Sequence, residues 1–224
     1  MKQTTHPVAQ PLPVRPVQTG LIAAGERLIG EAGLAGVSLR QVSAAAGTRN
    51  NYAVQYHFGD LMGLIRAIVT WRTPEIEQRR AAALAAADKN APFDTRAVID
   101  IFFRPLIDLV DEDRLPHFAR FMLALHSAPD GWKPLDDMFF MMPVTERLLD
   151  LFKAANPHIP SPVIWQRLRP ISVMVLTYAC GPTVIGGAKE YRDNVIDGLF
   201  DMAAAALSVP VRETTASKVY GMVF

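Results

Sequence analysis

Residues 38–47 contain both a start signal and a stop signal for one short helix. Ser38-Leu39-Arg40-Gln41 has the form of a capping box, in which the serine hydroxyl and the glutamine side chain satisfy backbone groups of the first helical turn. Gly47 then stops the helix after the small residues of 43–46. Because these side chains are small, another helix can cross this one closely.

The segments on both sides of this short helix also show helical patterns. A first helix is expected to start after Thr19 as its N-cap and to end near Gly33, followed by a glycine-bracketed connection over 33–37. A third helix is expected over about 48–56, and Asp60 can cap a fourth helix with an apolar stripe. The third helix is unusually polar, and a helix that served only the core would not need this polarity.

The rest of the chain keeps a helical pattern and shows no alternating run typical of a β-strand. Helix breaks are expected at Pro74 and within 90–92, 111–116, 129–134, 156–162 and 181–187. The predicted fold is therefore all-α.

Composition excludes several classes of protein. Hydrophobic residues make up 50% of the chain and charged residues 20%, which excludes a disordered chain. The single cysteine, Cys180, can form neither an internal disulfide nor a cysteine-based metal cage, so a cytoplasmic location is expected. The 19 residues of 170–188 carry no charge, but their prolines and glycines favour a buried helix at a subunit interface over a membrane span.

The two parts of the chain differ in charge. Residues 1–72 contain seven Lys/Arg against three Asp/Glu, whereas residues 73–224 contain sixteen against nineteen. Such an imbalance indicates that the first part meets a polyanion such as nucleic acid.

The stretch 21–68 resembles the DNA-binding region of the TetR (tetracycline repressor) family, over about a fifth of the chain. The matching elements occur at fixed spacing: Leu28-Ile29-Gly30-Glu31-Ala32-Gly33, the helix start Val37-Ser38-Leu39-Arg40-Gln41-Val42, Ala45-Ala46-Gly47, and Tyr56-His57-Phe58 followed by Leu64 and Ala67. The prolines of 1–18 and the lack of a continuous apolar stretch there indicate a flexible arm. The resemblance implies a three-helix helix-turn-helix DNA-binding domain (19–72) and a helical ligand-binding and dimerisation domain (73–208), with a C-terminal tail (209–224) after them.

Arginine and asparagine side chains on a short exposed helix can pair with base edges in the major groove. The resemblance further implies that Tyr56 contacts the DNA backbone or a thymine methyl and that His57 binds a phosphate, which positions the protein without reading sequence. The candidate DNA-binding residues are Ser38, Arg40, Thr48, Arg49, Asn50, Asn51, Tyr52, Gln55, Tyr56 and His57. An ordinary polar loop is the alternative interpretation of Arg49-Asn50-Asn51.

The chain departs from the family pattern at two places. The segment from Gly47 to Phe58 is one residue longer than usual, with Gln55 where the family generally has tyrosine, so the register of the base contacts is left open. Asp60-Leu61 replaces a small residue followed by lysine, which removes one expected phosphate contact. We therefore expect the DNA affinity to depend more on Arg15, Arg40 and the flexible arm.

The second domain is rich in methionine and aromatic residues, which suit an apolar ligand. The candidate ligand-binding residues are Phe103, Phe121, Met122, His126, Met142, Trp165 and Tyr178, although core packing remains the alternative for each of them. The dimer interface is expected on the last two long helices, at Met174, Val195, Leu199, Met202 and Ala206, which repeat at helical spacing.

These features predict a transcriptional regulator that binds a palindromic operator as a homodimer and, as a repressor, is released by a small apolar effector. A constitutive dimeric DNA-binding protein without an effector is the alternative, and a helical enzyme is a weaker one. No cofactor or metal is expected: nucleotide-binding and hydrolase motifs are missing, and His117 and His126 would face opposite sides of one helix.

Overall fold

The computed structural model describes residues 16–87, 93–113, 115–129, 131 and 142–211, with the side chains of residues 182 and 183 excepted. All regular elements in this part of the chain are helices, which confirms the predicted all-α fold. They are α1 (Pro16–Ala32), the 3-10 helix η1 (Leu34–Gly36), α2 (Leu39–Ala45), α3 (Ala53–Phe58), α4 (Leu61–Ala86), α5 (Thr95–Ile107), α6 (His117–Ser127), α8 (Pro143–Ala155), α9 (Ser161–Ala179), α10 (Pro182–Ile185) and α11 (Lys189–Ser208).

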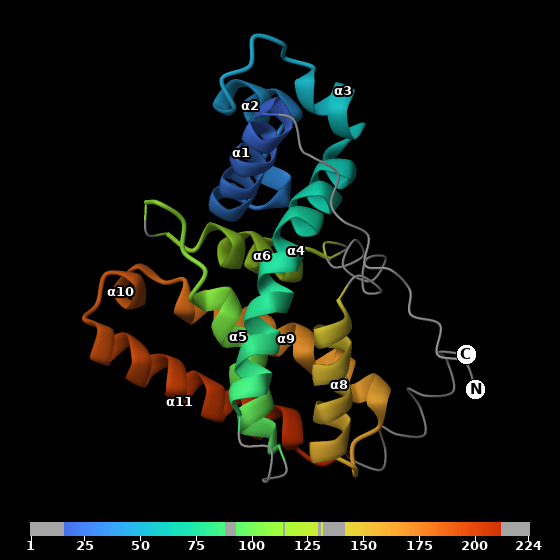
Figure 1. Cartoon of the computed structure of the whole chain (residues 1–224), viewed down its shortest axis with the longest axis vertical. Coiled ribbons are helices and arrows are strands. Elements are labelled where there is room, and N and C mark those ends of the chain that lie inside the picture. Colours follow the sequence, from blue (N-terminus) through green and yellow to red (C-terminus); the bar gives the residue numbers. More distant parts are fainter. Residues whose placement is uncertain (1–15, 88–92, 114, 130, 132–141, 212–224) are drawn as a thin grey trace.

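The N-terminal domain consists of α1, α2 and α3, packed against the first turns of α4 at one end of the molecule (Figure 1). Its core is formed by side chains without solvent exposure, namely Leu21, Ile29, Val42, Val54, Leu64 and Ile68. The predicted capping box is confirmed: Gln41 N–H donates to Ser38 Oγ over 3.3 Å, and Ser38 N–H donates to Gln41 Oε1 over 2.8 Å. The pair α2 and α3 forms a helix-turn-helix.

Two predicted helix starts differ from the structure. α1 begins at Pro16 rather than after Thr19, because proline fits the first turn of a helix, where its missing N–H needs no partner. α3 begins only at Ala53, so residues 48–52 form a turn instead of the first half of the helix. The predicted Asp60 cap is confirmed, since Gly63 N–H donates to Asp60 Oδ1 over 2.7 Å.

α4 joins the two domains. It has 26 residues, which corresponds to ~39 Å, and it passes through the expected domain boundary at 72/73 without a break. The break predicted at Pro74 is wrong, because this proline lies inside α4. The helix therefore links the end of α3 to the interior of the second domain (Figure 1).

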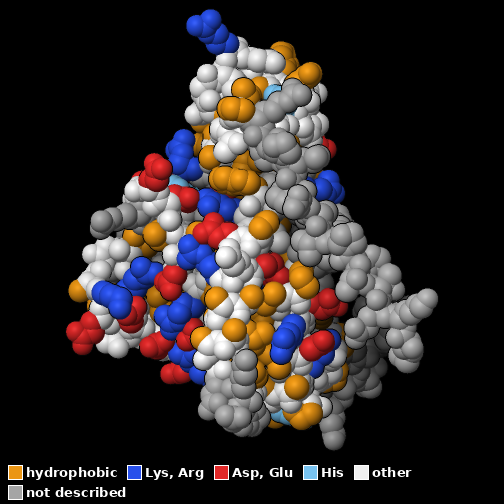
Figure 2. Space-filling model, in the orientation of Figure 1, with side chains coloured by type: hydrophobic (Ala, Val, Ile, Leu, Met, Phe, Trp, Pro, Cys, Tyr) orange, Lys and Arg blue, Asp and Glu red, His pale blue; other side chains and the backbone are white. Residues whose placement is uncertain are grey.

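In the second domain α4 packs against α5 and α8, α6 packs against α9, and α11 packs against α5 and α9 (Figure 1). Its core contains fully buried aromatic side chains, among them Phe103, Phe121, Phe152 and Phe200. At the surface, Arg96 and Arg104 of α5 bind Asp197 of α11 over 3.1 and 2.8 Å, and charges of both signs alternate over these two helices (Figure 2). Helix α11 is thus fixed to the body of its own chain.

Among the described residues, every helix is too short or too polar to span a bilayer.

Candidate DNA-binding surface and ligand cavity

The turn between α2 and α3 is held by hydroxyl groups. Ser43 is fully buried on α2, and its Oγ lies 3.5 Å from the N–H of Val54 on α3. The Thr48 hydroxyl lies 3.0 Å from the carbonyl oxygens of both Ser43 and Asn50. These contacts fix the turn on the two helices, while the DNA contact predicted for Thr48 stays a prediction.

Asn50 forms part of the turn that precedes α3. Its Oδ1 accepts a hydrogen bond of 2.9 Å from Tyr52 N–H, and its carbonyl accepts one of 3.0 Å from Ala53 N–H. Asparagine commonly forms such a turn with the backbone two residues on. One lone pair of Asn50 Oδ1 thus supports the turn, and the base contact predicted for this side chain stays a prediction.

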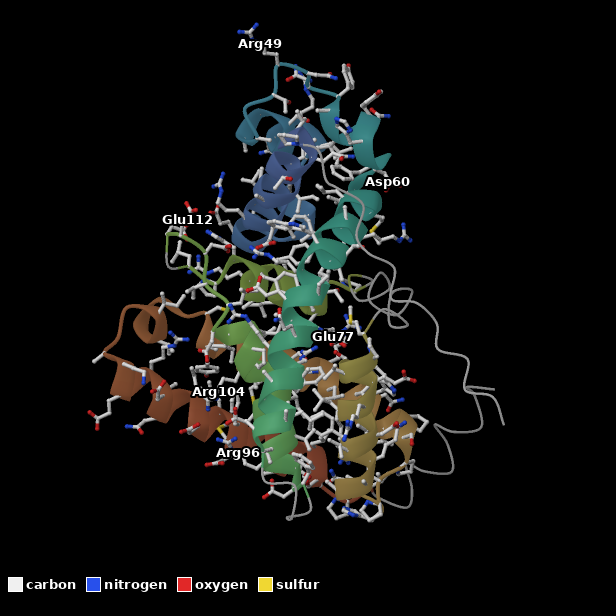
Figure 3. The ribbon with its side chains drawn as sticks, viewed as in Figure 1. Arg49, Asp60, Glu77, Arg96, Arg104 and Glu112 are labelled. Carbon is white, nitrogen blue, oxygen red and sulfur yellow. The ribbon has the colours of Figure 1, made fainter. Side chains whose placement is uncertain are left out.

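The remaining predicted residues form an exposed surface at the tip of the molecule. Arg49 extends away from the protein there (Figure 3), and Asn51, Gln55 and two tyrosines are exposed beside it. Tyr52 is 69% exposed and Tyr56 80%, which is unusual for such large aromatic side chains. This surface offers one cation, two amides and two phenol rings, a combination suited to bases, phosphates and thymine methyl groups.

His57 and the start of α2 flank this surface. The His57 ring is half-buried and meets the Tyr56 ring edge-on, with ring centroids 4.9 Å apart. The Ser38 hydroxyl is occupied by the capping box, whereas Arg40 is exposed on α2. Arg15, which we expected to support DNA affinity, lies outside the described residues.

A buried ion cluster joins the two domains beneath this surface. Arg72 of α4 donates to both carboxylate oxygens of Glu26 on α1, over 2.8 and 2.7 Å, and to Asp111 before α6 over 2.7 Å. Burial alone would lower the pKa of the Arg72 guanidinium, but its bonds to the two carboxylates raise it above the ordinary value. Arg72 therefore stays charged and connects α1, α4 and the loop before α6.

Sequence reasoning missed this cluster because its members are 39 and 46 residues apart in the chain. A second, local ion pair lies nearby, where His117 Nε2 and Asp113 Oδ2 are 2.7 Å apart. In the part of the chain that the structure describes, no group of three His, Cys, Asp or Glu side chains is arranged to hold a metal ion.

A cavity of about 110 Å³ lies inside the second domain. Five of the seven predicted ligand-binding residues line it, namely Phe103, Met122, His126, Met142 and Trp165. The other two do not line it: Phe121 is buried in the core, and Tyr178 is 61% exposed near the end of α9. Residues of α4, α5, α6, α8 and α9 complete the wall, including Val69, Thr73, Ile76, Phe102, Leu106, Phe118, Leu149, Ser172 and Leu176.

Three polar residues missed by sequence reasoning form one side of this cavity. Glu77 of α4 accepts hydrogen bonds from the N–H of Val144 and the hydroxyl of Thr145 at the start of α8, over 2.7 and 2.5 Å (Figure 3). Arg80 donates to Thr145 Oγ1 over 2.7 Å and to the Phe102 carbonyl over 2.8 Å. Burial lowers the pKa of Arg80 to about 10, which still leaves it charged at neutral pH. Glu77 and Arg80 are three residues apart on α4, and this spacing was the sequence signal that could have identified them as a pair.

His126 is the remaining polar group of the cavity that we predicted. Its Nδ1 atom is buried without a hydrogen-bond partner. Burial, with a further contribution from the charge of Arg169, lowers the pKa of His126 to about 4. At neutral pH its imidazole is therefore uncharged.

The predicted dimer residues differ in their exposure within the chain. Met202 is 58% exposed and Ala206 is exposed, while Met174 and Val195 are half-buried. Leu199 is only 6% exposed and packs into its own chain. The apolar face of α11 thus divides between the core and the surface.

These observations define an all-α protein with an N-terminal helix-turn-helix, joined by one long helix to a helical domain with an internal cavity. Neither models of known protein families nor curated proteins give a match to the sequence. Among solved structures, a TetR family transcription regulator from Marinobacter aquaeolei VT8 matches with 16% identity and a TM-score of 0.55, covering 85% of this chain and 95% of that one. A transcriptional regulator from Rhodococcus sp. Rha1 matches with 20% identity and a TM-score of 0.52, covering 87% and 99%. The chain has the fold of TetR-family regulators, as the resemblance implied.

Proposed function

We propose that this chain is a transcriptional regulator that binds duplex DNA through the exposed surface of the turn 48–52 and α3. The observation that carries this proposal is the combination of Arg49, Asn51, Gln55 and two exposed tyrosines on a helix-turn-helix whose core is fully packed. The second helix of a helix-turn-helix typically enters the major groove, where such side chains contact bases and phosphates. The charge imbalance between the two parts of the chain favours the same surface.

The chain acts as a homodimer on a palindromic operator. The exposed apolar residues Met202 and Ala206 on α11, with Met174 on α9, favour an interface on these two helices. Two-fold symmetry would place the exposed surface of 48–52 and α3 from each subunit on one of two half-sites ~34 to 36 Å apart. A small change in the relative tilt of the subunits would then spoil the fit to DNA.

The cavity is the effector site, and the protein is a repressor that the effector releases. α4 supports this proposal, because the same helix contacts the end of α3 and supplies Val69, Ile76 and Arg80 to the cavity wall. An effector can alter DNA affinity only if it binds more tightly to one of two arrangements of the DNA-binding surfaces in the dimer. A coupling free energy of ~1 to 3 kcal/mol would be ordinary.

Selection of bound sequences from a random duplex library tests the DNA-binding proposal. We expect an inverted repeat to be enriched, and we expect the selected duplex to bind ~10³-fold or more tightly than random DNA at the same salt concentration. Weak binding to every duplex, without enrichment, would contradict the proposal.

Calorimetry tests the link between effector and DNA. The effector affinities of the free protein and of the operator complex must differ by the same factor as the operator affinities without and with effector. Equal effector affinities in both titrations would favour a constitutive DNA-binding dimer, and turnover of the bound molecule would favour an enzyme.

A further inference from the structure

Features that bend helices meet in one turn of α4. Pro74 lies inside the helix, so it offers no N–H to the carbonyl of Thr70, and in a helix interior a proline ring also crowds this carbonyl. The hydroxyls of Thr70 and Thr73 each donate to the carbonyl four residues back, over 2.8 Å. Bonds of this kind often bend helices, and proline is a common cause of sharp kinks. Helix α4 therefore resists bending least at residues 70–74.

This turn lies where α4 passes from one domain into the other (Figure 1). Before it, Leu64 and Ile68 are buried in the core of the N-terminal domain. After it, Ile76 and Arg80 line the cavity of the second domain, and Thr73 of the turn itself also lines that cavity. A bend at 70–74 would thus change the angle between the two domains.

A close contact between α1 and α6 limits how the domains can move. A β-carbon on Gly30 of α1 would lie 3.0 Å from Arg120 Cβ and 3.1 Å from the backbone nitrogen of Phe121 on α6. The two helices therefore meet at Gly30 with no side chain between them. Rotation about such a point disturbs the packing of the two domains less than their separation does, and α4 must bend to follow this rotation.

Arg72 lies in the same turn of α4 and opposes the rotation. Its bond of 2.7 Å to Asp111 ties the turn to the loop before α6, which belongs to the second domain. Its two bonds to Glu26 hold the guanidinium in place for Asp111. The Arg72 side chain is only 10% exposed, so little water is available to replace a broken bond, and separating the charges there is costly.

We propose that residues 70–74 of α4 form a hinge between the two domains and that the ion pair of Arg72 with Asp111 locks this hinge. The locked hinge fixes the orientation of the surface formed by 48–52 and α3 relative to the second domain. Because Val69 and Thr73 line the cavity, a molecule bound there would contact the hinge directly. Only this last step rests on the proposed function.

The distance between two spin labels in one chain tests the hinge without DNA or an effector. Ala44→Cys on α2 and Arg147→Cys on α8 place the labels at exposed positions of the two domains, in a Cys180→Ala background. Dilution with unlabelled chain restricts the signal to pairs within a chain. From Leu61 to Pro74 α4 covers ~20 Å, so a bend of ~20° would move its first turn by ~7 Å.

The lock is tested by substitutions in the loop before α6. Asp111→Ala should broaden a narrow distance distribution by several ångströms, while Arg72 stays paired with Glu26 and the core stays intact. Asp113→Ala is the matched control, because Asp113 pairs over 2.7 Å with His117, four residues further along the same segment. The control should leave the distribution narrow.

The hinge is tested by adding Pro74→Ala to Asp111→Ala. Alanine restores the N–H for the Thr70 carbonyl, and because Pro74 is exposed, its removal costs little packing. The combined variant should therefore narrow the distribution again although the lock is absent. Pro74→Ala alone should keep the distance of the locked chain.

A narrow distribution in Asp111→Ala, or equal broadening in Asp113→Ala, would overturn the lock. Broadening that Pro74→Ala does not reverse would overturn the hinge. If Asp111→Ala does not melt cooperatively, Asp111→Asn takes its place, since it removes the charge and keeps the shape of the side chain.

Operator binding is measured separately on the same variants. If the distances behave as expected but operator affinity does not change, the hinge stands and has no part in DNA binding. If no variant binds DNA specifically, the proposed function fails and the hinge is unaffected.

Discussion

The backbone carbonyl of Phe58, at the end of α3, lies directly against Gly63 in the first turn of α4. A β-carbon on residue 63 would approach the Phe58 carbonyl oxygen to 1.8 Å, which no packing adjustment of a side chain can relieve, because the obstacle is backbone. Glycine at this position therefore allows the end of α3 to lie this close to the first turn of α4.

Gly63→Ala should lower both Tm and DNA affinity, because α3 and α4 must move apart to admit the methyl group. The matched control, for Tm alone, is Gly198→Ala in α11, where a β-carbon meets nothing within 4 Å. At an unobstructed helical position this change stabilises by ~1 kcal/mol, since alanine favours helix more than glycine does. Thermal melting of both variants checks the contrast, and a stable Gly63→Ala protein with normal DNA binding would contradict it.

Arg49→Ala should reduce sequence discrimination. If Arg49 pairs with a guanine, its loss should cost ~1 to 3 kcal/mol on the selected operator and much less on random DNA. Arg79→Ala is the control, because Arg79 is an exposed arginine of α4 that binds Glu75 over 2.8 Å. Titrations with both kinds of DNA at one salt concentration measure the difference, and equal weakening on both would reduce Arg49 to a phosphate contact.

His57→Ala should weaken binding to every DNA sequence by a similar factor, because a phosphate contact carries no base information. The half-buried ring also supports Tyr56 through its edge-on contact, so His57→Gln, which retains a donor, should recover part of the affinity. A changed base preference at one position, with random-DNA affinity intact, would mean that the motif is aligned one residue out of register.

Met202→Asp should convert the proposed dimer into a monomer that binds a half-site poorly, since the interface would bury an unpaired charge. Met202 is 58% exposed within its chain, so the substitution should leave the fold of the subunit intact. Leu199→Asp is a poorer test, because Leu199 is buried within its own chain. Ala85→Asp on the exposed face of α4 is the control. A full dimer of Met202→Asp in solution sizing would move the interface elsewhere.

His126 should make stability depend on pH between about 4, its pKa in the folded chain, and 6.5, the ordinary value. The unfolded chain binds the proton more readily, so the stabilisation is complete above pH 6.5 and is lost as the pH falls to about 4. The full contribution is about 3 kcal/mol as an order of magnitude. Urea unfolding of the wild type and of His126→Phe across this range measures it, and parallel pH profiles for the two proteins would contradict the assigned pKa.

The elements predicted correctly from the sequence depend on contacts between near neighbours in the chain. The capping box of Ser38 and Gln41 and the Asp60 cap each join residues three apart, so the residue types alone specify them. The helical periodicity likewise indicated an all-α fold. Four of the five predicted residues that line the cavity were identified because methionine and aromatic residues are concentrated in the second domain, and His126 was chosen as a polar residue among them.

Contacts across the fold decided the rest. The start of α3 depends on Ser43 meeting Val54 and on the turn of Asn50, which override the helical pattern of 48–52. Whether an apolar residue lies in the core, the cavity wall or a surface depends on packing between helices, and periodicity cannot distinguish these for Phe121, Tyr178 or Leu199. The bonds of Arg72 to Glu26 and Asp111 form only when α1, α4 and the loop before α6 meet, because the three residues are far apart in the chain. Burial of these charges in the fold, rather than local propensity, selects the pairing.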